Sequence, residues 1–256
     1  MNRINQLFKD QQDKVKSIYF TAGHPQMGTA LTIIQELEKN GIDMIEIGMP
    51  FSDPLADGPT IQRSSEFALK NGMTVKKLLE EIKDVRQTVH IPLLLMGYFN
   101  TVLKYGVEQF CKDVSAIGID GLILPDLPLE YYETHYKACF EKYNLIPVFL
   151  ITPQTPEERI RQTEKLSKGF IYMVSTASTT GAQEGYSVET MNYFKRIQDM
   201  KLRVPTVTGF GISNKASLEQ ASRYAAGGII GSAFVKAIDQ SQDLKRDIAH
   251  FVESLK

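Results

Sequence analysis

Eight short apolar runs, separated by amphipathic segments, recur along the chain and constrain its fold more than any other feature. Each run is almost continuously hydrophobic, which is typical of parallel strands that are buried on both faces. The runs cover residues 18–21, 44–48, 92–97, 121–125, 146–151, 170–174, 204–208 and 228–231. We therefore expect eight strands that alternate with helices.

The segments between these runs carry helix signals. Residues 30–39 place apolar side chains on one face and end at Asn40-Gly41. The longest interval, after the second run, has room for two helices, at 61–70 and 75–86. Another helix is expected to start with Thr155 as its cap, Pro156 in the first position and Glu158 closing a capping box.

Eight such units in 256 residues predict a single (β/α)₈ TIM-barrel domain spanning 1–256. The alternative is a doubly wound open sheet, which fits less well because no G-x-G-x-x-G follows the first strand. Two additions to the simple barrel are expected. One is an N-terminal helix around Leu7 and Phe8 that closes the barrel bottom, and the other is the extra helix after the second strand.

The charge balance argues against several classes of partner. Lys and Arg number 29 against 30 Asp and Glu, a net charge of −1, so no broad basic surface is available for nucleic acid or acidic lipid. Two cysteines cannot build a disulfide framework. No signal-peptide core or membrane-length apolar run is found. We expect a cytoplasmic protein without a membrane partner.

Glu46 is the most informative single residue, because it interrupts an apolar run. In a strand, Ile45 and Ile47 share one face and Glu46 takes the other, so its carboxyl group is expected to point into the barrel. Burial raises the pKa of a carboxyl group, which suits a general acid or base near neutral pH. The alternative is a buried glutamate satisfied by a hydroxyl group or a cation.

The segment 50–59, which follows this run, contains three prolines and a glycine and should be stiff. It carries Asp53 and Asp57, either of which could be an ordinary turn residue. A second carboxylate above Glu46 is nevertheless the arrangement expected where two carboxyl groups divide acid and base roles.

Glycines lie at or shortly after the ends of the last three runs, at Gly181, Gly211 and Gly231. Barrel enzymes often bind phosphate through backbone N–H groups after strands seven and eight. Helix capping alone could explain Gly231-Ser232, but glycines after adjacent strands favour a phosphate site.

Other chemistries are argued against by the residues. No lysine falls at the end of a predicted strand, where a Schiff-base aldolase would need one. The four histidines lack metal-ligand spacing and are expected in solvated or turn positions. The chemistry that remains is acid–base catalysis, in which carboxyl groups of the protein act on a small phosphorylated substrate.

The segment 46–62, EIGMPFSDPLADGPTIQ, closely resembles the signature of the tryptophan synthase alpha subunit family. The resemblance covers essentially the whole chain and includes the segments 19–25, 98–100, 124–128, 209–213 and 231–233. It implies retro-aldol cleavage of indole-3-glycerol phosphate to indole and glyceraldehyde 3-phosphate. It also implies an alpha2-beta2 heterotetramer in which the beta subunit holds pyridoxal phosphate, while this chain needs no cofactor or metal.

The same resemblance implies roles for particular residues. Glu46 matches the principal acid and base, Asp57 the carboxylate that binds the indole N–H, and Tyr172 a tyrosine beside the glutamate. The implied substrate-binding residues are Tyr19, Met96, Ile123, Ile151, Thr180, Gly181, Gly211, Gly231 and Ser232. Because the stiff loop projects from the barrel mouth, we also expect Pro50 and Asp53 to contact the beta subunit.

One stretch departs from the family pattern: Ser178 stands where relatives usually carry glycine. Residues 175–187 include two glycines and several small polar residues with few apolar side chains, and we expect them to form a lid in which Thr180 meets Asp57.

Two alternative functions remain. One is another phosphate-binding barrel enzyme, such as indole-3-glycerol phosphate synthase, which would require catalytic lysines on barrel strands, and none is found at the end of a predicted strand. The other is a catalytically silent regulatory barrel, which the presence of both Glu46 and Asp57 argues against, because such a protein would not need two carboxyl groups at the barrel mouth.

Overall fold

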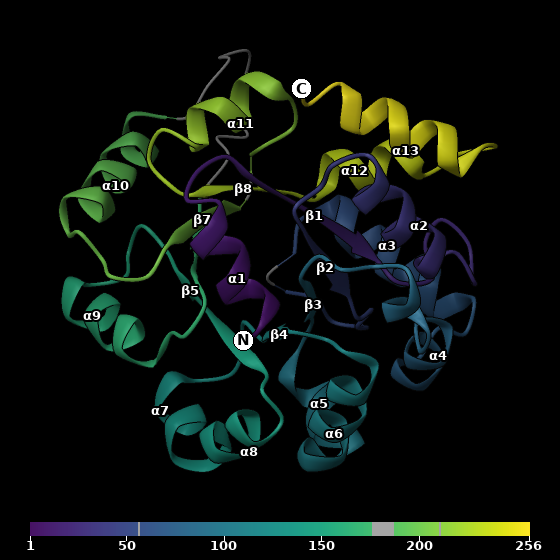
Figure 1. Cartoon of the computed structure of the whole chain (residues 1–256), viewed down its shortest axis with the longest axis horizontal. Coiled ribbons are helices and arrows are strands. Elements are labelled where there is room, and N and C mark those ends of the chain that lie inside the picture. Colours follow the sequence, from purple (N-terminus) through teal and green to yellow (C-terminus); the bar gives the residue numbers. More distant parts are fainter. Residues whose placement is uncertain (56, 176–186, 210) are drawn as a thin grey trace.

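Eight parallel strands close into a barrel in which each strand pairs with the next in sequence and β8 pairs with β1 (Figure 1). The computed structural model describes residues 1–55, 57–175, 187–209 and 211–256. The strands are β1 Val15–Thr21, β2 Met44–Gly48, β3 Leu93–Met96, β4 Gly121–Ile123, β5 Ile146–Ile151, β6 Ile171–Val174, β7 Thr206–Gly209 and β8 Gly227–Ile230. The expected (β/α)₈ fold is confirmed.

A ring of helices surrounds the barrel, as Figure 1 shows. Within the described part of the chain, none of them combines the length and apolar character needed to cross a bilayer. The helices are α1 Arg3–Asp10, α2 Ala30–Lys39, α3 Pro59–Lys70, α4 Val75–Glu81, α5 Phe99–Tyr105, α6 Val107–Ile117, α7 Leu129–Tyr131, α8 Lys137–Lys142, α9 Glu157–Leu166, α10 Val188–Asp199, α11 Lys215–Ala221, α12 Ser232–Ile238 and α13 Leu244–Glu253. The pair α3 and α4 confirms the extra helix after the second strand.

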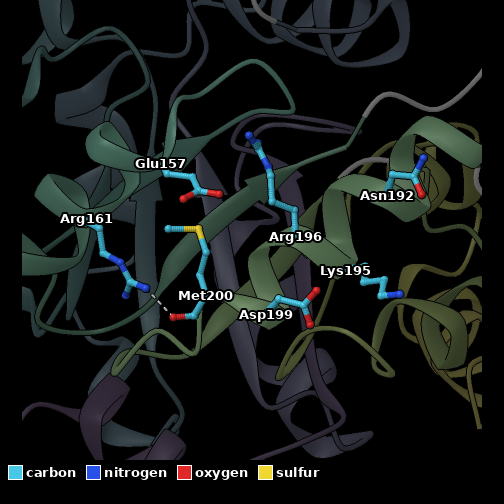
Figure 2. A pocket seen from close by; sticks show the side chains of 7 residues that line it. All are labelled: Glu157, Arg161, Asn192, Lys195, Arg196, Asp199 and Met200. Atoms are coloured by element: carbon cyan, nitrogen blue, oxygen red, sulfur yellow. Dashed lines mark hydrogen bonds between the residues drawn. The ribbon is translucent and has the colours of Figure 1, made fainter.

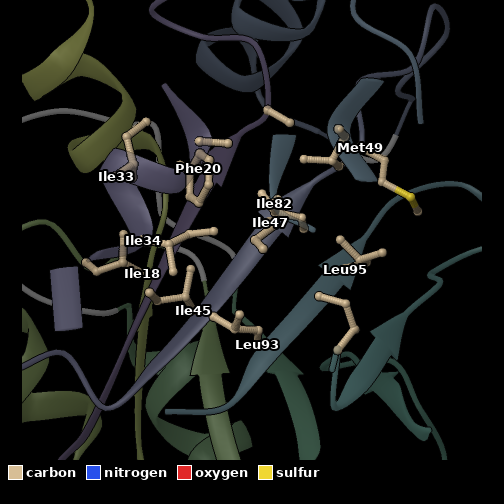
Figure 3. Packing of buried hydrophobic residues seen from close by; sticks show 14 of the residues in the cluster. Ile18, Phe20, Ile33, Ile34, Ile45, Ile47, Met49, Ile82, Leu93 and Leu95 are labelled. Atoms are coloured by element: carbon tan, nitrogen blue, oxygen red, sulfur yellow. The ribbon is translucent and has the colours of Figure 1, made fainter. Parts of the chain in front are cut away.

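The larger part of the core lies between the strands and the helices. Alternation along β2 sends Ile45 and Ile47 outward, where they pack with Ile33 and Ile34 of α2 (Figure 3). All four are fully buried. This layer fixes which residues of β2 can face the interior.

A second core fills the barrel itself. Met44, Leu94 and Phe170 contribute to it, and Ile4 of α1 closes it from the N-terminal end of the barrel. Phe8 of α1 packs on Phe170 with ring centroids 5.6 Å apart. The expected closure of the barrel bottom by the N-terminal helix is therefore confirmed, and it leaves the opposite end as the site of chemistry.

The predicted cap of α9 is wrong. The helix begins at Glu157, and no side chain caps its N-terminus. The Thr155 hydroxyl oxygen instead accepts a hydrogen bond from the Thr152 N–H at 2.9 Å. A threonine that follows a strand can stabilise the turn behind it as readily as the helix ahead of it.

Candidate active site

Glu46 lies in the barrel interior and is completely buried. Its position follows from the strand, because Ile45 and Ile47 occupy the outer layer. Burial raises its pKa from 4.5 to about 8, and a hydrogen bond from the Ser17 hydroxyl to Oε1, 3.3 Å long, lowers the pKa in part. Oε2 has no hydrogen-bond partner among the described residues. A carboxyl group with this pKa is largely protonated at neutral pH and can donate a proton.

Asp57 is the second carboxyl group at the mouth. The loop that carries it is closed by a hydrogen bond from the Asp57 N–H to the Pro54 carbonyl at 3.0 Å, directly before α3. Burial raises the pKa of Asp57 to about 6, and the Tyr98 hydroxyl, 3.5 Å from Oδ2, lowers it in part. Phe51 stacks on Tyr98 with centroids 4.8 Å apart. Asp57 is thus mostly ionised at a pH where Glu46 is mostly protonated.

Two tyrosines face the interior beside these carboxyl groups, Tyr19 from β1 and Tyr172 from β6. Burial raises the pKa of both, and the nearby carboxylates Glu46 and Asp57 raise it further, so both phenols are neutral at ordinary pH. Glycine in a neighbouring strand makes room for each ring. An added Cβ would lie 2.2 Å from the Tyr19 hydroxyl at Gly48, and 2.0 Å from the Tyr172 hydroxyl at Gly209.

The apolar wall differs from the prediction in one place. Met96 and Ile123 face the barrel interior as expected. Ile151 faces the other way, into the layer that includes Ile160 of α9 and Phe194 of α10, so its assignment to the substrate pocket is wrong. Leu150 faces the interior in its place, because side chains alternate along β5. A nearly continuous apolar run does not reveal which of its residues point inward.

The glycines predicted to hold phosphate lie where β7 and β8 end. Gly211 has φ of +77°, a left-handed conformation that favours glycine. Gly231 caps the N-terminus of α12, whose first residue is Ser232. A Cβ at Gly231 would lie 3.5 Å from Cβ of Tyr19, so this turn adjoins the pocket. Thr180, Gly181 and most of the proposed lid lie outside the described residues.

The residues predicted to contact a partner lie in the loop that follows β2. Asp53 is exposed and Pro50 is half-buried. Leu55, two residues after Asp53, is 92% exposed. An open groove of about 580 Å³ runs between this loop and α3.

A groove of about 480 Å³ lies between α9 and α10, and Glu46 and Asp57 are not among the residues that line it (Figure 2). It is lined with charged side chains, but the arginines are used by the fold. Arg161 donates to the Met200 carbonyl at 2.6 Å, and Arg196 donates to the Pro153 and Thr155 carbonyls. Both guanidinium groups therefore stabilise the backbone around the groove.

His24 lies in a turn, one of the two kinds of position expected for the histidines: its backbone N–H donates to the Thr21 carbonyl at 3.1 Å. Its side chain is buried rather than solvated, and its Nε2 lies 2.8 Å from Oδ1 of Asp239, which also binds Arg63. Among the described residues, no group of three or more potential ligands is placed to hold a metal ion.

A closed parallel barrel in which two partly or fully buried carboxyl groups differ in pKa has the fold and the kind of site that are typical of a (β/α)₈ enzyme. The sequence model of the tryptophan synthase alpha chain family matches residues 7–256. The chain belongs to this family, whose members are lyases that cleave indole-3-glycerol phosphate.

Individual relatives agree with this assignment. The chain is 58% identical to the tryptophan synthase alpha chain of Flavobacterium psychrophilum over 94% of this chain and 95% of the relative. It is 54% identical to that of Christiangramia forsetii over 100% and 99%. The crystal structure of tryptophan synthase subunit alpha from Legionella pneumophila superposes with a TM-score of 0.89 at 29% identity, covering 100% of this chain and 97% of the other.

Proposed function

We propose that Glu46 and Asp57 carry out the cleavage of indole-3-glycerol phosphate in this chain. The observation that carries the proposal is the environment of Glu46, a fully buried carboxyl group with one hydroxyl partner and a pKa of about 8. Asp57, with a pKa of about 6, supplies the negative charge. Environments that separate the pKa values of two carboxyl groups assign the acid and the base.

The reaction proceeds in two proton transfers. Glu46 in its acid form donates its proton to indole C3, and the ring becomes a cation that the Asp57 carboxylate stabilises through the indole N–H. The bond from C3 to the glycerol carbon then breaks, and its electron pair returns to the indole ring. The Glu46 carboxylate takes the proton of the adjacent glycerol hydroxyl, whose oxygen becomes the aldehyde oxygen. Glu46 is protonated again when indole and glyceraldehyde 3-phosphate leave.

The remaining predicted residues hold the substrate. Tyr19, Met96 and Ile123 contact the indole ring, with Leu150 in the place first given to Ile151, and Tyr172 packs beside Glu46. Backbone N–H groups bind the phosphate at Gly211, Gly231 and Ser232, together with Thr180 and Gly181 from the loop after β6.

We further propose that the chain works in the cytoplasm with a tryptophan synthase beta subunit, as an alpha2-beta2 heterotetramer with pyridoxal phosphate only in the partner. The exposed side chains of Asp53 and Leu55, which line the groove along α3, support this contact, and Pro50 lies half-buried at the start of the same loop.

The test is an indole-formation assay on the purified chain, with and without a beta subunit. Indole release by the chain alone, increased by the beta subunit, is expected. A folded chain that releases no indole in either condition would refute the proposed function.

A further inference from the structure

Ser17 is a polar side chain in the barrel interior, where most of its neighbours are apolar. It lies on β1 in register with Met44 of β2 and Ile229 of β8, and all three residues are buried. Burying a hydroxyl group is unfavourable unless it is hydrogen-bonded. The presence of serine at this level of the core therefore depends on the partner that its hydroxyl finds.

That partner is Glu46. The Ser17 hydroxyl donates to Oε1 at 3.3 Å, whereas Oε2 has no hydrogen-bond partner among the described residues. A hydroxyl group can donate to a carboxyl oxygen whether or not the other oxygen carries a proton. The contact thus makes the two oxygens of Glu46 different, one held toward β1 and the other available.

We propose that Ser17 is a positioning residue for Glu46, which holds Oε1 and leaves Oε2 as the oxygen that gives and takes protons. The inference rests on the proposed function, in which Glu46 is the acid. It adds that a neighbouring hydroxyl group makes Glu46 a stronger acid than burial alone would, because the hydrogen bond stabilises the carboxylate that remains after the proton is donated.

The other titratable groups around Glu46 do not replace this effect. Tyr19 of β1, Tyr172 of β6 and Asp57 of the following loop face the same interior. Both tyrosines are neutral at ordinary pH because burial raises their pKa. Within the described ranges, the hydrogen bond from Ser17 is the one interaction that lowers the pKa of Glu46 against the effect of burial.

The experiment is the pH dependence of indole formation by Ser17→Ala. In the wild-type protein, activity should rise as Asp57 ionises (the acid limb) and fall at higher pH as Glu46 loses its proton (the alkaline limb). Loss of the Ser17 hydroxyl should move the alkaline limb to higher pH by about one unit and leave the acid limb in place. Ser17→Thr, which keeps a hydroxyl, should restore the wild-type limb. If Ser17→Ala does not fold, Ser17→Cys fills the space with a weaker donor and should shift the same limb in the same direction.

Thr208→Val is the matched control. It also removes a fully buried hydroxyl group, which has no hydrogen-bond partner among the described residues. Thr208 belongs to the outer face of β7, because its neighbour Val207 faces the barrel interior. This variant should leave both limbs unchanged.

A ligand-free measurement separates this inference from the proposed function. The pKa of Glu46, followed by ¹³C NMR in the labelled protein, should rise in Ser17→Ala. An unchanged NMR pKa would overturn the role of Ser17. A raised NMR pKa together with an unmoved alkaline limb would support the role of Ser17 and refute Glu46 as the acid of the reaction.

Discussion

The hydroxyl group of Tyr172 occupies the space that a side chain on Gly209 would need. A Cβ at Gly209 would lie 2.0 Å from the hydroxyl oxygen and 2.3 Å from Cζ. The strands β6 and β7 are neighbours, so the ring of one reaches over the end of the other. Glycine at this strand end therefore determines where the tyrosine beside Glu46 lies.

Gly209→Ala should displace Tyr172 and reduce indole formation by at least about tenfold, because misplaced active-site groups are costly. Activity and thermal unfolding are measured together. Tyr172→Phe is the control, since it removes the hydroxyl without adding bulk, and it should keep more activity than Gly209→Ala. Equal activity in Gly209→Ala and the wild-type protein would show that the position of Tyr172 is unimportant.

The pH dependence of kcat/KM should be bell-shaped. Activity needs ionised Asp57 and protonated Glu46, so it should rise through pH about 6 and fall through pH about 8. Asp57→Asn should abolish the acid limb. A profile that stays flat from pH 5 to 9 would contradict the assignment of both carboxyl groups.

Stability should depend on pH through the same buried glutamate. The pKa of Glu46 is about 8 in the folded protein and near 4.5 when exposed. The folded state therefore binds the proton more tightly. Protonated Glu46 contributes its full stabilisation of the folded state below pH 4.5, and this contribution is lost as the pH rises to about 8. Glu46→Gln should consequently unfold at higher urea concentration than the wild-type protein at pH 9, and the gap should narrow toward pH 5. A pH-independent gap would mean that Glu46 is not desolvated.

Asp57→Asn should lower kcat by about 10²–10³-fold and leave substrate Kd nearly unchanged. An amide oxygen can still accept the indole N–H, but it cannot offset the charge of the ring in the transition state. This expectation is checked by measuring the single-turnover rate and the substrate Kd of Asp57→Asn and of the wild-type protein. A change confined to Kd would mean that Asp57 only positions the ring.

Asp239 should contribute to stability through its buried contact. It binds His24, whose side chain is 4% exposed, and Arg63, whose side chain is 65% exposed. Asp239→Ala leaves His24 without its partner and should cost about 1–3 kcal/mol in urea unfolding. Arg63→Ala breaks only the exposed pair and should cost less than about 1 kcal/mol. Equal losses of unfolding free energy in the two variants would contradict the larger contribution that we assign to the buried His24–Asp239 contact.

The sequence predicts the barrel well because the fold depends on repeated patterns. The inward direction of Glu46 is readable, since Ile45 and Ile47 mark the outer face of β2. The direction of Ile151 is not readable, because β5 is apolar at nearly every position and its two faces differ only in what they contact.

Other site features depend on contacts between distant strands. Ser17 precedes the predicted start of the first strand at residue 18, and nothing local links it to Glu46, which is 29 residues away. The burial of His24 likewise requires Asp239, which is 215 residues away. Side-chain partners at such separations are set by the closure of the barrel.

The most direct test of the account is the single-turnover cleavage of indole-3-glycerol phosphate by Glu46→Gln, with substrate Kd measured on the same protein. We expect the rate to fall by about 10²–10⁴-fold or more, since one group serves both proton transfers, and Kd to stay close to the wild-type value. Glu66→Gln, an exposed change on α3, should leave both unchanged. Wild-type turnover by Glu46→Gln would contradict the central claim that the buried carboxyl group is the acid and base of the reaction.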